Sequence, residues 1–129
     1  MQDRPNAQEL AQAVLEFLQN EIAPALQDKR LKFHTLVAMN GLGILVRELT
    51  HEDTLLRDEL QRLGKLLGQA APVSPMPEQL KHDVLALNRE LARRIRQNQP
   101  PQGALQAVKQ TIADKLRVAS PRYLEKFVP

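Results

Sequence analysis

The segment LKFHTLVAMNGLGILVREL, residues 31–49, decides the fold class of this 129-residue chain. Its large apolar residues spread around the whole circumference of a helix instead of following one side. A helix that is apolar on every side is usually buried on every side. We therefore expect residues 31–49 to be the central helix of an all-α bundle, where the small residues Ala38 and Gly41 let a neighbouring backbone approach closely.

The segments on either side are amphipathic, with apolar residues at helical spacing. Asn6 with Glu9 three residues later resembles a capping box and begins the first helix. Thr50 with Asp53 is expected to begin a third helix, which Gly68 ends. The residues expected to face inward in these two helices are Leu10, Val14, Phe17, Leu18, Ala25, Leu56, Leu60, Leu63 and Leu67.

Two further helices follow the proline-rich loop at residues 69–77. Pro77 suits the first position of a fourth helix, and Pro100 and Pro101 separate that helix from a fifth. The residues expected to face inward here are Leu80, Val84, Leu87, Leu91, Ile95, Leu105, Val108, Ile112 and Leu116. No segment alternates as a strand does. The sequence therefore predicts an all-α fold, a single-domain bundle of about five helices over residues 1–129.

Composition excludes several classes of chemistry. The chain has no cysteine, so it has no disulfide, no thiolate nucleophile and no Cys-ligated metal. The first residues lack the apolar core of a signal peptide, and the longest apolar run, 36–46, is far shorter than the roughly 18 residues of a membrane span. Glu48 and His51 have the spacing of di-iron bundle ligands, but such a site needs a second copy of the motif. We expect a cytoplasmic protein with no membrane contact, no metal and no cofactor.

Polar residues interrupt faces that should be apolar. Buried polar groups normally satisfy one another, so the first interpretation is a structural network, with Glu21 beside His34 or Arg47 and Asn40 beside Asn88. The alternative is an interhelical pocket for a ligand. The residues on these faces are Glu21, His34, Asn40, Arg47, Glu48 and Asn88.

A basic stripe, Arg89, Arg93 and Arg96, lies opposite the apolar side of the fourth helix. Residues 65–129 carry 11 Lys and Arg against 5 Asp and Glu, so the stripe is a candidate surface for an acidic protein partner. Nucleic-acid binding is disfavoured, because no aromatic residue accompanies the stripe and no helix-turn-helix frame is visible.

Five short motifs carry a family resemblance: EFLxxExxPAL at 16–26, FHxxVAxN at 33–40, REL at 47–49, LNREL with IR at 87–96, and KLxVxxPRYL at 115–124. Together they resemble a small bacterial all-helical family of unknown function, whose members tend to be encoded beside aminoglycoside-phosphotransferase-like kinases and acyl-CoA dehydrogenases. The resemblance implies a kinase-like protein or an acyl-CoA dehydrogenase as partner. It adds Lys115, Arg122 and Tyr123 to the candidate residues above.

Two functions follow from these observations. The first is a non-catalytic accessory or protein-interaction module that assists a kinase-like or acyl-CoA dehydrogenase pathway, with a homodimer as its expected form. The second is a small-ligand-binding domain or enzyme, with His34 as general base oriented by Glu21 or Glu48 in an interhelical pocket.

Overall fold

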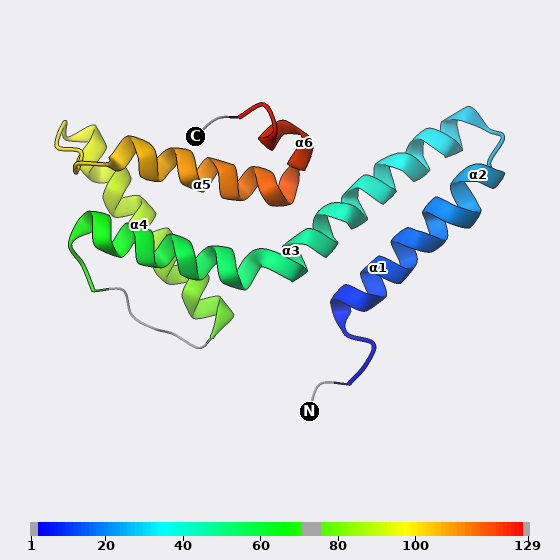
Figure 1. The fold of residues 1–129 in the computed structure, drawn as a ribbon, viewed down its shortest axis with the longest axis horizontal. Coiled ribbons are helices and arrows are strands. Elements are labelled where there is room, and N and C mark those ends of the chain that lie inside the picture. The colour runs from blue at the N-terminus through cyan, green and yellow to red at the C-terminus, as the bar shows by residue number, and fades with distance from the viewer. Residues whose placement is uncertain (1–2, 71–75, 128–129) are drawn as a thin grey trace. The chain divides into compact units, whose positions relative to one another are not determined.

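The computed structural model describes residues 3–70 and 76–127, which are mainly helical with no strand among them (Figure 1). The all-α prediction is therefore confirmed. The elements are α1 (Ala7–Phe17), a π-helical segment η1 (Leu18–Ile22), α2 (Ala23–Ala25), α3 (Lys29–Leu67), α4 (Pro77–Arg96), α5 (Ala104–Ala119) and α6 (Pro121–Leu124). None of the described helices is long and apolar enough to cross a membrane.

The chain divides into two compact units, Met1–His51 and Glu52–Pro129. Helix α3 contributes its first half to one unit and its second half to the other. The single-domain description stays a prediction. Each unit is described by itself below.

The first unit is a helical hairpin, in which α1 runs antiparallel to the first half of α3 (Figure 1). The predicted capping box begins α1: the Glu9 amide donates to Asn6 Oδ1 at 2.8 Å, and the Asn6 amide donates to Glu9 Oε2 at 3.0 Å. The more buried side of α1 carries Ala11 and the half-buried Leu15. Pro24 lies in the short α2, where the chain turns toward α3.

The predicted helix boundary at Thr50 is wrong. Helix α3 runs without interruption from Lys29 to Leu67. The Thr50 hydroxyl donates to the Val46 carbonyl at 2.6 Å, four residues earlier, so it bonds within the helix and caps nothing. The predicted second and third helices are one.

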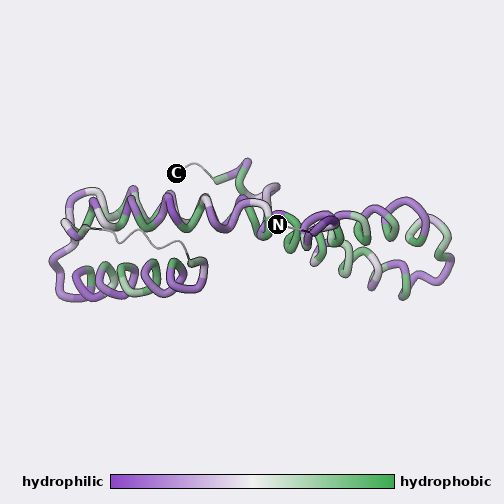
Figure 2. The backbone as a smooth tube through the Cα atoms, turned by 90° about the horizontal axis from the view of Figure 1, so that it is seen from below, coloured by the Kyte–Doolittle hydropathy of each residue, from purple (hydrophilic) through white to green (hydrophobic). Residues whose placement is uncertain are grey.

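The predicted burial of residues 31–49 on every side is also wrong. Leu31, Phe33 and Val37 are 54%, 64% and 56% exposed. A two-helix hairpin can bury only one side of each helix, so a segment that is apolar all round keeps apolar side chains in solvent. Figure 2 shows apolar positions recurring along both helices of this unit.

The second unit holds the larger core, built from the second half of α3 with α4 and α5. Leu63 and Leu80 are almost fully buried, as predicted. Gly68, at φ +68°, ends α3, and Pro77 begins α4. Residues 71–75 of the predicted loop lie outside the described residues. The core residues are Leu60, Leu63, Leu67, Leu80, Val84, Leu87, Leu91 and Ala104.

Helix α5 does not bury its predicted face. Leu105 and Ile112 are 71% and 41% exposed, whereas Ala104, Ala107 and Asp114 are buried. Alanine side chains allow close approach of two helix backbones, and α5 packs through this side of small residues.

Candidate functional site

Hydrogen-bonded polar side chains join the three helices of the second unit. The Asn88 amide on α4 donates to Glu59 Oε1 on α3 at 2.8 Å, and to the Val84 carbonyl at 3.1 Å. The Thr111 hydroxyl on α5 donates to the same Glu59 oxygen at 3.5 Å. Glu59 therefore links all three helices. Asn88 belongs to this network, and its partner is Glu59 instead of the expected Asn40.

An ion pair joins α3 to α5 next to this network. Arg62 Nη2 lies 3.0 Å from Asp114 Oδ2, with the two side chains 23% and 11% exposed. Arg62 Nη2 also donates to Thr111 Oγ1 at 3.3 Å, and the Gln110 amide donates to Asp114 Oδ1 at 3.0 Å. The carboxylate thus has a partner on each oxygen, which offsets the cost of removing its charge from water.

A cavity of about 220 Å³ opens beside the network, between α3, α4 and α5. It brings together two of the predicted site residues, Asn88 and Lys115, from different helices. The Asn88 amide is engaged with Glu59, whereas the Lys115 side chain is exposed. The remaining lining residues are mainly apolar: Leu63, Leu91, Ala107, Val108, Thr111 and Ile112.

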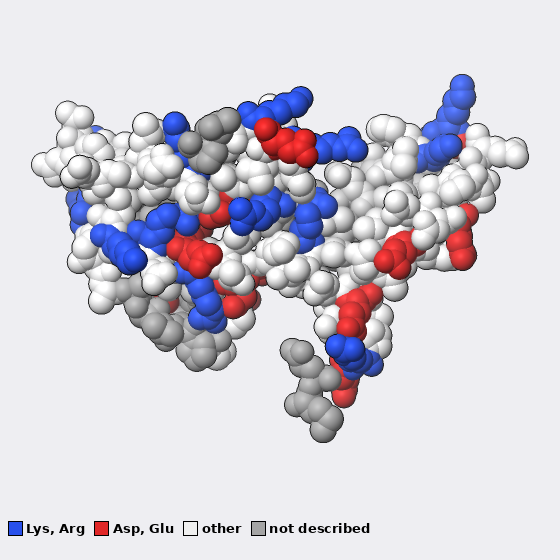
Figure 3. Space-filling model, in the orientation of Figure 1, with Lys and Arg blue, Asp and Glu red and all other residues white. Residues whose placement is uncertain are grey.

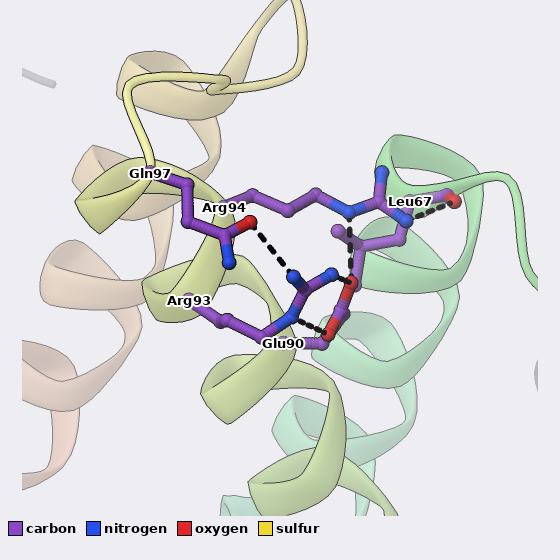
Figure 4. A network of polar contacts seen from close by, with 5 residues as sticks. All are labelled: Leu67, Glu90, Arg93, Arg94 and Gln97. Atoms are coloured by element: carbon purple, nitrogen blue, oxygen red, sulfur yellow. Dashed lines mark hydrogen bonds and ion pairs between the residues drawn. The ribbon is translucent and has the colours of Figure 1, made fainter.

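Figure 4 shows a second polar cluster, at the end of α4. Arg93 makes two bonds to the Glu90 carboxylate, with Nη2 to Oε1 at 2.6 Å and Nε to Oε2 at 2.8 Å. Arg94 Nε reaches Oε1 of the same carboxylate at 2.9 Å, and its Nη2 donates to the Leu67 carbonyl at the end of α3 at 3.4 Å. These bonds, from Arg93 first and then Arg94, lower the pKa of Glu90 to about 2. Arg94 thereby ties the end of α4 to a carbonyl in the last turn of α3.

Arg93, a member of the predicted basic stripe, is held in this cluster by other side chains at the end of α4. The Arg93 guanidinium is held by Glu90 and by Gln97, whose side-chain oxygen accepts at 2.8 Å. Arg89 and Arg96 are exposed. The second unit carries 13 of the 18 Lys and Arg residues, and Figure 3 shows several of them on the face in view. The stripe stays a predicted partner surface, with Arg93 its most constrained member.

The predicted polar residues of the first unit are mostly in solvent. Glu21 lies in the π-helical segment and is exposed, and His34, Asn40 and Glu48 are exposed along α3. The His34 ring contacts the edge of Phe33, with 6.0 Å between ring centroids. Arg47 is half-buried and folds back along its own helix, so that a Cβ at Gly43 would lie 3.2 Å from its Nη1.

The remaining predicted residues, Arg122 and Tyr123, lie on α6. Both are exposed, Tyr123 by 65%. Among the residues that the structure describes, there is no group of three or more His, Asp or Glu side chains that could hold a metal ion.

Sequence reasoning missed the residues that carry the network of the second unit, Glu59, Arg62, Thr111 and Asp114. Burial of Asp114 was not predicted, because the apolar pattern of α5 predicted that the side with Leu105 and Ile112 is the buried one. A signal was nonetheless present, since Ala104, Ala107 and Asp114 recur at helical spacing with small side chains.

Comparison with known proteins places the chain in a family. Residues 24–123 match the family described as Domain of unknown function (DUF6285). The chain belongs to that family. The DUF6285 match covers α3, α4 and α5 and leaves α1 outside it. No curated protein and no solved structure matches the chain.

Proposed function

We propose that this DUF6285 protein is a non-catalytic accessory protein of the bacterial cytoplasm that binds other proteins through its first unit. One observation carries the proposal, a line of three large apolar side chains on α1 that remain about half exposed. Leu10, Val14 and Phe17 recur at one side of that helix and are 53%, 49% and 50% exposed. These three residues are called the α1 face below. Contiguous exposed apolar side chains mark interaction surfaces more often than isolated ones do.

The α1 face offers modest binding energy. Fully burying a large apolar side chain stabilises by about 1.5–3 kcal/mol, so covering the exposed halves of three is worth about 3 kcal/mol in all. Association itself costs more than that. The complex must therefore extend onto neighbouring side chains, and we expect micromolar affinity.

The family resemblance supplies two classes of partner, a kinase-like protein and an acyl-CoA dehydrogenase. In this proposal the partner performs the chemistry and the helical protein binds it. Arg89 and Arg96 of the second unit, which are exposed, would be a separate surface for acidic groups of a protein partner.

The test is a calorimetric titration of each purified candidate partner with the purified protein. We expect one of them to bind, and Val14→Glu to weaken binding roughly tenfold or more, because a carboxylate would be buried in an apolar contact. Gln8→Glu, an exposed change on the same helix, is the control and should leave the affinity unchanged. If neither partner binds, or if both variants bind like the unaltered protein, the proposal is wrong.

The cavity of the second unit favours a second candidate, a small-ligand site. Its volume, about 220 Å³, suits a short aliphatic group rather than a drug-sized molecule. Lys115 would attract a carboxylate at the open end, since the polar groups of Asn88 and Thr111 are already bonded to Glu59. Titration with hexanoate, followed by amide NMR shifts, tests this. Shifts confined to residues around the cavity and abolished by Lys115→Met support a site; unchanged spectra exclude it for this ligand class.

The structure gives the general-base role no comparable support. His34 is exposed, and its ring contacts Phe33. A general base has to lie within hydrogen-bond reach of the proton that it removes, in a place where substrate can be held. His34 instead lies beside a surface that is better suited to a protein contact.

A further inference from the structure

A second apolar face runs along the first half of α3. Phe33, Val37, Asn40 and Ile44 are spaced by four, three and four residues, which is the spacing of a helix–helix seam. Phe33 and Val37 are 64% and 56% exposed, Asn40 is exposed and Ile44 is half-buried. These four residues are called the α3 face below.

The α3 face differs from the side of the helix that is more buried. The half-buried residues Thr35, Met39, Leu42 and Val46 repeat at helical spacing along another side of α3. With about 100° between successive residues, this line and the α3 face lie on well-separated sides of the helix. The α3 face is therefore available to a partner.

Opposite charges stand at the two ends of the α3 face. Arg30 lies seven residues before Val37, and Glu48 lies four residues after Ile44. Both are exposed. They are 18 residues apart, which is five full helical turns and about 27 Å. They therefore flank the face on the same side and are too far apart to pair within one chain.

We propose that the α3 face pairs with the α3 face of a second copy of this chain, with the two helices antiparallel. The proposal deepens the proposed function, on which it rests, by naming one partner of the first unit. A two-fold axis across an antiparallel pair places the same flank of both helices together. Arg30 then lies beside Glu48 of the second copy, at both ends of the seam.

The positions of Arg30 and Glu48 decide whether the two helices pair parallel or antiparallel. In a parallel pair the two-fold axis runs along the helices, so the charged flanks of the two copies lie on opposite edges of the seam and no Arg30 lies beside a Glu48. The antiparallel pair places two opposite-charge contacts at its edges. The same surface and the same charges therefore complement themselves, as a symmetric dimer requires.

Asn40 lies one residue from the midpoint between Arg30 and Glu48, so it falls beside the two-fold axis. A polar residue in an apolar seam costs stability and fixes the register, because a shifted pair would bury its amide without a partner. Arg47 does not obstruct the seam, since its guanidinium folds back toward Gly43 at one side.

Sedimentation equilibrium over a series of concentrations tests the pairing. We expect a reversible dimer, and Val37→Glu to raise its dissociation constant by roughly tenfold or more, because a charge would be buried at the centre. Gln61→Glu, an exposed position on the same helix outside the face, is the matched control. Circular dichroism has to show the helical content of the unaltered protein in every variant.

A charge exchange tests the direction. Arg30→Glu and Glu48→Arg should each weaken the dimer, and the double variant should restore it, since the two side chains can meet only between chains. A protein that stays monomeric throughout overturns the proposal. A dimer that is insensitive to Val37→Glu, or one that the double variant does not restore, overturns it as well.

The two proposals fail separately. If the protein dimerises as expected but binds neither the kinase-like protein nor the dehydrogenase, only the proposed function is contradicted. A monomer that still binds the kinase-like protein or the dehydrogenase, with sensitivity to Val14→Glu, contradicts the self-pairing alone.

Discussion

The Asn88 amide nitrogen lies 2.8 Å from Glu59 Oε1, joining α4 to α3 across 29 residues of sequence. The same amide donates to the Val84 carbonyl one turn earlier, at 3.1 Å. A single side chain thus fixes the position of one helix against another. The sequence indicated that Asn88 needed a partner, but proposed Asn40 for that role.

Replacing Asn88 by alanine should destabilise the second unit by about 1–3 kcal/mol, because the half-buried Glu59 carboxylate loses its closest donor. Urea unfolding followed by circular dichroism measures this loss. Arg89→Ala, at the adjacent exposed position, should change the free energy of unfolding by less than about 0.5 kcal/mol. Equal effects of the two substitutions would contradict a structural role for Asn88.

Asp114→Ala should cost about 3 kcal/mol, the range expected when one member of a largely buried ion pair is removed. Among the residues that the structure describes, Arg62 would then keep its contact with the Thr111 hydroxyl, at 3.3 Å. The same unfolding experiment measures the change, with Asp58→Ala as the exposed control on α3. A loss no larger than that of the control would show that the ion pair is energetically neutral.

Glu90 should make the free energy of unfolding depend on pH below about 4.5. Its pKa in the folded protein, about 2, lies below its usual 4.5 because Arg93 and Arg94 bond to the charged form. The stabilisation is therefore complete above pH 4.5 and is lost as the pH falls from about 4.5 to about 2. The stability difference between the unaltered protein and Glu90→Gln should shrink across this window. A difference that stays constant with pH would contradict the assignment.

His34→Ala should leave the fold and its stability nearly unchanged, within about 0.5 kcal/mol, because the ring is exposed. Thermal unfolding of the variant measures this directly. A loss of several kcal/mol would instead place His34 in a buried network, as the sequence-based interpretation had it.

Local signals in the sequence predicted the helix ends well where backbone chemistry is specific. Asn6 caps α1, Gly68 ends α3 with a positive φ, and Pro77 begins α4. Each of these residues does something that few others can do. Thr50 misled because a threonine hydroxyl can bond either to a helix terminus or to the carbonyl four residues earlier, and only the folded chain shows which.

Packing partners were harder to predict. Apolar periodicity shows that a side of a helix avoids water, but not whether another part of the same chain or another molecule covers it. The pattern of residues 31–49 was correctly described as apolar all round, yet Phe33 and Val37 remain exposed. Helix α5 buries Ala107 and Asp114 because small side chains permit close contact, a preference that a count of apolar residues does not capture.

The central claim is that the first unit binds protein through apolar side chains, and the heat-capacity change of complex formation tests it most directly. Burial of apolar surface gives a negative heat-capacity change. We expect calorimetric titrations at several temperatures, with the candidate partner that binds, to give a clearly negative heat-capacity change. Val14→Glu should make this change smaller in magnitude. A heat-capacity change near zero, or one that Val14→Glu does not alter, would contradict the claim.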